Sequence, residues 1–194
     1  MLSFEDSDGR LDLLRLLAKN AEIRGSITEL RNKSVTYRLT EIDEAVAIDA
    51  ELTRWWNEVD EYLEPNTLGS FPISRRHQVT LVVLRHESII ALNKHTLATS
   101  KKTSTYDAAL QNCISAARSI ISALQKALET QVNLDRPRAE EEPGNSGLLW
   151  PSFTWAVWMS AFIMIYAANE DQVSQDVAIR FVSLFFGSAL ALYL

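Results

Sequence analysis

The sequence predicts an all-α fold, a bundle of about six helices. Three observations support this prediction. Apolar residues in the long segments recur with the helical period of 3.6. Glycine and proline are few, 6 and 5 in a chain of 194 residues, so little interrupts a helix. Strong helix formers occupy most of the long segments.

The chain length suits a single domain with a substantial core. We therefore expect residues 1–194 to form one all-helical domain. Its expected parts are an N-terminal helix with its connection (1–37), core helices (38–131), a mobile loop (132–147) and an apolar C-terminal helix pair (148–194).

Leucines at helical spacing predict a first helix over residues 10–24, with Ser7 or Asp8 available as its cap. A second helix is expected over residues 38–63, ended by the proline and glycine that follow. Its apolar face consists of Ala45, Ile48, Leu52, Trp55, Trp56, Val59, Tyr62 and Leu63.

The third predicted helix covers residues 74–100 and carries apolar residues on several faces, which indicates a central position. One side of it presents Val79, Val82, Val83, His86, Ile90, Asn93 and Leu97.

The fourth predicted helix, residues 107–131, contains the single cysteine of the chain. Cys113 lies within an apolar stripe and beside a row of alanines, where a thiol acts as a small hydrophobic group. We interpret it as a packing residue. The expected core includes Leu52, Ile90, Leu97, Cys113, Ala116, Ala117, Ile121 and Leu124.

Two apolar helices separated by the polar turn NEDQ are expected after residue 147. Segment 148–168 is long and apolar enough to suggest a bilayer span, which would make the chain a membrane-associated protein anchored by residues 148–168 and 177–194. The flanks are acidic and lack the Lys and Arg that orient a span. A buried helix pair is therefore the leading interpretation, and a membrane anchor is the alternative.

The composition disfavours several classes of function. A net charge of -6 opposes direct nucleic-acid contact. One cysteine cannot form an internal disulfide or a cysteine-based zinc site. The three histidines are nine residues apart, so successive ones point to opposite sides of a helix. Phosphate loops, nucleophile elbows and zinc-protease motifs do not occur in the sequence. We expect no enzyme activity, no metal and no cofactor in this chain.

Aromatic residues near His86 suggest a ligand pocket between helices. The candidate effector pocket comprises Trp55, Trp56, His86, Asn93, Trp155 and Trp158. The structural alternative is that the tryptophans pack in the core and that His86 is a hydrogen-bonded core histidine.

Three stretches occur in the order IDAELTRWWNEVDEYL, HESIIALNKHTLATSKKTSTYDAALQNCISAARSII and WPSFTWAVWMSAFIMIYAA. Together, over residues 42–168, they resemble the regulatory middle homology region of fungal zinc-cluster (Zn₂Cys₆) transcription factors. The matching positions are Leu52 and Trp55, then Ile90, Leu92 and Leu97, then Cys113, Ala116 and Ala117, and finally residues 151–168. Lys94 and His95 stand where the family has Arg-Pro.

The resemblance implies a non-enzymatic, nuclear domain that regulates transcription by binding a small-molecule effector or other transcriptional regulators. Zinc would belong only to the family's six-cysteine DNA-binding module, which this chain lacks. The chain is then either a fragment or a product without that module. Apolar faces on the last two helices leave self-association open.

Overall fold

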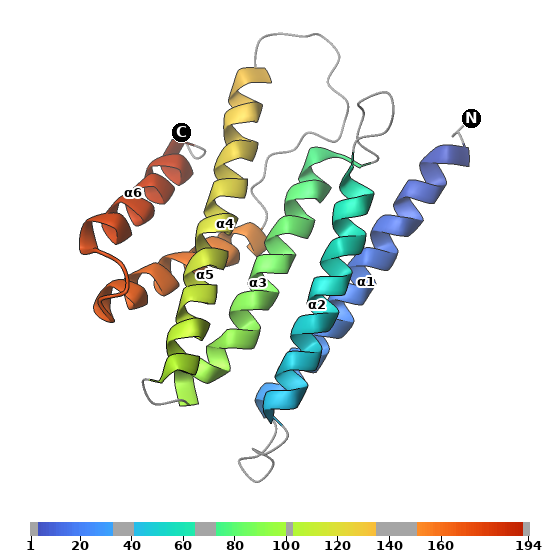
Figure 1. The fold of residues 1–194 in the computed structure, drawn as a ribbon. Coiled ribbons are helices and arrows are strands. Elements are labelled where there is room, and N and C mark those ends of the chain that lie inside the picture. The colour runs from blue at the N-terminus through green and yellow to red at the C-terminus, as the bar shows by residue number, and fades with distance from the viewer. Residues whose placement is uncertain (1–3, 33–40, 65–72, 100–102, 135–150, 192–194) are drawn as a thin grey trace. The chain divides into compact units, whose positions relative to one another are not determined.

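The computed structural model describes residues 4–32, 41–64, 73–99, 103–134 and 151–191. These ranges form six α-helices and no strand (Figure 1), which confirms the all-α prediction for the described part of the chain. The helices are α1 (Phe4–Asn32), α2 (Glu41–Leu63), α3 (Arg75–Thr99), α4 (Ser104–Leu134), α5 (Pro151–Asn169) and α6 (Gln175–Ala191).

The chain divides into two compact units, Met1–His95 and Thr96–Leu194. The single domain expected over residues 1–194 stays a prediction. The predicted loop 132–147 begins too early, because α4 continues to Leu134. The remainder of that loop lies outside the described residues.

Helix α1 is longer than the predicted segment 10–24 at both ends. The prediction that Ser7 or Asp8 caps it is wrong, because both residues lie inside the helix. Beyond residue 24 the apolar period continues through Gly25, at which an added Cβ would meet no neighbouring atom. The buried side chains of α1 are accordingly spread over most of its length: Leu13, Leu16, Asn20, Ile23, Ile27 and Leu30.

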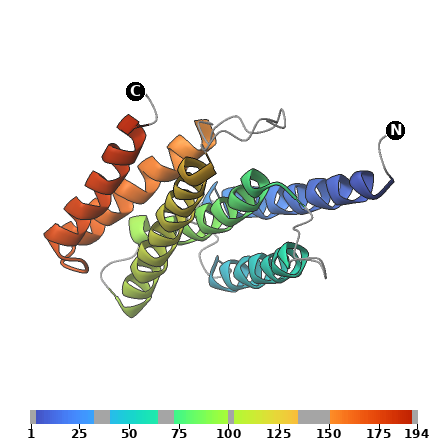
Figure 2. The same cartoon turned by 90° about the horizontal axis from the view of Figure 1, so that it is seen from above.

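In the first unit, α1, α2 and α3 lie side by side (Figure 2) around one apolar core. Trp55 of α2 is fully buried at its centre. Its indole Nε1–H donates a hydrogen bond of 2.8 Å to the backbone carbonyl of Leu16 in α1. A buried indole requires such a partner, and here the partner fixes where α2 meets α1.

Polar pairs at the edge of this core set how α1 lies against its two neighbours. Lys19 forms an ion pair with Glu58 of α2. Arg24 Nη1 lies 2.8 Å from Glu87 Oε2 of α3. Each pair joins residues far apart in sequence, so together they disfavour sliding or rotation of α1.

In the second unit, α5 packs against α4 on one side and against α6 near its C-terminal end. Small residues let the backbones of α4 and α5 approach closely. Tyr106 of α4 and Tyr166 of α5 share a hydroxyl–hydroxyl hydrogen bond at the edge of the contact. Buried residues of α5 are Phe153, Ala156, Val157, Ser160, Ala161, Ile163, Met164 and Ala167.

The turn after α5 has the hydrogen bonds of a Schellman motif. The N–H of Gln172 bonds to the carbonyl of Ala167, and the N–H of Asp171 bonds to the carbonyl of Ala168. Asp171 has a φ of 56°, in the left-handed region where a side chain is strained. The predicted turn NEDQ therefore contains an aspartate at the position that glycine normally occupies.

Replacing Trp55 with Phe should destabilise the first unit by about 2 kcal/mol, because the hydrogen bond to Leu16 is lost and the smaller ring leaves a void. The measurement is urea unfolding followed by circular dichroism. Trp56→Phe is the matched control, since the neighbouring Trp56 is only half-buried and should cost less. Equal losses in the two variants would contradict this account of the core.

Replacing Asp171 with Gly should stabilise the second unit by about 0.5–1 kcal/mol, because glycine adopts positive φ without strain. Thermal unfolding would measure the effect. Asp107→Gly, in the first turn of α4, is the same substitution at a helical position and should destabilise. A loss of stability on Asp171→Gly would contradict the role assigned to this turn.

Candidate functional site

Four of the six residues of the predicted effector pocket lie in the first unit. Trp55 and Trp56 are adjacent on α2, with ring centroids 6.2 Å apart. The Arg85 guanidinium of α3 lies over the Trp56 ring, 4.3 Å from its centroid, a cation–π contact that the sequence did not suggest. Trp55 is enclosed in the core, whereas Trp56 is half-buried. Trp56 and Arg85 are therefore partly exposed side chains in contact with each other, and we call this pair the Trp56–Arg85 wall.

His86 and Asn93 are both half-buried on α3. Asn93 donates a hydrogen bond of 2.8 Å to the carbonyl of Ile89, within its own helix. His86 Nδ1 is buried and has no hydrogen-bond partner in the described part of the chain. Burial lowers the pKa of His86 to about 4, and the neighbouring Arg85 charge adds to the shift. At neutral pH this imidazole is uncharged.

Trp155 and Trp158 belong to the second unit and lie on the more exposed side of α5. They share that side with Phe162 and Ile165, at exposed fractions of 59%, 44%, 58% and 52% in chain order. Trp158 and Phe162 are in ring contact, with centroids 5.9 Å apart. We call these four residues the α5 stripe. Sequence reasoning missed Phe162 and Ile165, although the spacing of three and four residues from the tryptophans was visible.

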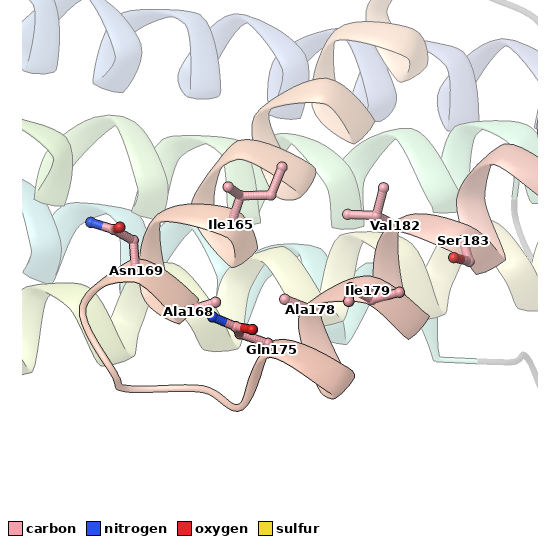
Figure 3. A pocket seen from close by; sticks show the side chains of 8 residues that line it. All are labelled: Ile165, Ala168, Asn169, Gln175, Ala178, Ile179, Val182 and Ser183. Atoms are coloured by element: carbon pink, nitrogen blue, oxygen red, sulfur yellow. The ribbon is translucent and has the colours of Figure 1, made fainter.

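A groove of about 440 Å³ lies between α5 and α6 (Figure 3), and Ile165 of the α5 stripe is one of its lining residues. Its size is within the range of small-molecule sites. The walls are mainly aliphatic, and the amide groups of Asn169 and Gln175 and the hydroxyl of Ser183 supply the polar positions. Such a groove suits an apolar side chain or ligand with one hydrogen-bonding group. It is lined by Ile165, Ala168, Asn169, Gln175, Ala178, Ile179, Val182 and Ser183.

The structure thus places the six pocket residues in two units, four in the first and two in the second. Whether they form one effector site stays a prediction.

Most residues expected in the core are buried. Cys113 is fully buried on α4, and burial raises the pKa of its thiol to about 12, so it is protonated and unreactive at neutral pH. Leu97 differs from the others in being only half-buried. The remaining buried members are Leu52, Ile90, Ala116, Ala117, Ile121 and Leu124.

Among the described residues, no group of three or more His, Cys, Asp or Glu side chains is arranged to hold a metal ion. The membrane alternative assigned anchors to residues 148–168 and 177–194. Within the part of the chain that the structure covers, no helix has both the length and the apolarity needed to cross a bilayer.

His86 should make the first unit less stable in acid. Its folded pKa of about 4 lies below the ordinary histidine pKa of 6.5, so the unfolded chain binds the proton first. Stability is therefore lost as the pH falls from about 6.5 to about 4, by about 3 kcal/mol from this residue. In His86→Gln that part of the loss should disappear, as measured by urea unfolding at a series of pH values. If the two proteins lose stability in parallel, His86 is not the titrating group.

Comparison with known proteins gives one informative similarity. The chain is 21% identical over 156 residues to the probable transcription factor FUP6 of Fusarium proliferatum (strain ET1). The match covers 77% of this chain and 20% of that protein, so the chain spans about a fifth of its relative's length. No family model and no solved structure matches the chain. The chain is therefore similar, over most of its length, to part of a fungal transcription factor.

Proposed function

We propose that this chain is a non-enzymatic regulatory domain of a fungal transcription factor, of the middle homology type found in the zinc-cluster family, and that it acts in the nucleus. The observation that carries the proposal is the similarity to a probable transcription factor along 77% of the chain. A match of that extent concerns a whole folded region and not a short motif.

The positions behind the family resemblance support a shared fold. Trp55 of α2 and Cys113 of α4 are fully buried. The neighbouring Ala116 and Ala117 are 2% and 0% exposed. Residues of this kind preserve helix packing and carry no chemistry of their own. The proposed function therefore rests on the similarity to a transcription factor. The residues that bind an effector or partner are expected on the surface of the domain and not among these core positions.

The proposed mode of action is binding of a partner protein or small effector, which changes how accessible other segments of the regulator are. A ligand shifts such an equilibrium only if it binds one arrangement better than the other. The α5–α6 groove and the Trp56–Arg85 wall are the candidate contact points for an effector. Zinc takes no part in this chain, since a two-zinc cluster needs six cysteines and the sequence has one.

A reporter assay tests the proposal. Residues 1–194 are inserted between an unrelated DNA-binding domain and a strong activation segment, and transcription is compared with a fusion carrying a helical spacer of equal length. The intact chain should change reporter output at least threefold. Ile120→Asp, which places a charge at a fully buried position of α4, should abolish the change because the helices no longer pack.

Val46→Glu is the matched control, since Val46 is exposed on α2 and the fold should survive. Its fusion should behave as the intact chain does. The same output from the intact chain, Ile120→Asp and the spacer would refute a regulatory role. The proposed relation to the zinc-cluster family is tested separately. Transcripts that contain this chain should encode a six-cysteine DNA-binding module upstream of it.

A further inference from the structure

Helix α5 is apolar around its whole circumference, and in the described part of the second unit one of its sides is about half exposed. No charged residue occurs from Pro151 to Asn169. Apolar helices of this kind are normally buried on all sides. The α5 stripe lies opposite the buried face at helical spacing, so the open side is one continuous strip and not a set of scattered residues.

We propose that the α5 stripe is a dimer interface, on which the same helix of a second copy packs in antiparallel orientation. Trp155, Trp158, Phe162 and Ile165 are separated by three, four and three residues, the spacing of a coiled-coil seam. This spacing reads the same in both directions. A two-fold axis near Ser160 therefore places Trp158 against Phe162 and Trp155 against Ile165 of the second copy.

The area is sufficient for a specific interface. About half of each stripe side chain is open, and Ile179 of α6 adds a fifth open apolar group. Together they expose on the order of 600 Å² of mainly apolar surface. Two such patches cover about 1,200 Å², the lower end of the range for stable complexes.

Charge also favours the antiparallel arrangement. The stripe contains no charge that would oppose its own copy. Exposed Asp171 follows the C-terminal end of α5. In an antiparallel pair, this carboxylate lies beside the first turn of the other α5, where free N–H groups favour negative charge. A parallel pair would instead bring the two Asp171 carboxylates together.

Sedimentation and light scattering of the 194-residue chain over ~1–100 µM test the proposal, and the chain should have twice the monomer mass. Phe162→Glu should raise the dissociation constant at least ~30-fold, because it puts a charge at the centre of the interface. Val46→Glu adds the same charge to an exposed apolar position on α2 and should leave the constant unchanged. Circular dichroism should show equal helix content in all three proteins.

Cysteine cross-linking tests the orientation. Trp155→Cys mixed with Ile165→Cys should form a disulfide between chains under mild oxidation, whereas neither variant alone should. Buried Cys113 does not compete. A chain that stays monomeric throughout, or a dimer that Phe162→Glu leaves intact, would overturn the proposal. Self-linking of Trp155→Cys would overturn the antiparallel geometry. Neither result depends on the reporter assay above.

Discussion

Several helices of this protein, α3 and α5 among them, carry apolar side chains on more than one face, so a single neighbouring helix cannot cover them completely. Helix α1 meets this constraint by placing a long row of buried residues between α2 and α3. Trp55 is the largest side chain enclosed there, and its hydrogen bond to Leu16 makes the position of α2 specific as well as favourable. In the second unit only part of the apolar surface of α5 is buried. The exposed part is the surface on which we propose that a second copy of the chain packs.

The existence and order of the helices could be predicted because the apolar period is long and few breakers interrupt it. Helix ends were less predictable. Ser7 and Asp8 have the chemistry of caps, yet α1 begins before them, because the preference of a single residue is a weak guide to where a helix starts. Asp171 shows the same effect at the other end of the chain: tertiary packing of α5 and α6 imposes a left-handed residue where the sequence has no glycine.

The candidate sites depended on information that periodicity does not contain. A repeat of apolar residues tells which side chains share a face, but it does not tell whether another helix covers that face. Trp55 and Trp158 look alike in sequence, whereas one is enclosed and the other is 44% exposed. Long-range polar pairs such as Arg24 with Glu87 are likewise unpredictable from one sequence, because 63 residues separate the partners along the chain. The groove between α5 and α6 depends on how the two helices pack against each other and has no signature in the residues alone.

The buried thiol of Cys113 is a natural probe of local unfolding in the second unit. While α4 stays packed, an alkylating reagent finds neither access to the sulfur nor an appreciable thiolate concentration. The rate at which this sulfur is alkylated therefore reports how often the second unit opens, and no engineered probe is needed. The rate of that labelling in the native protein would reveal how often the helices around α4 separate and how far ligands or neighbouring chains suppress such openings.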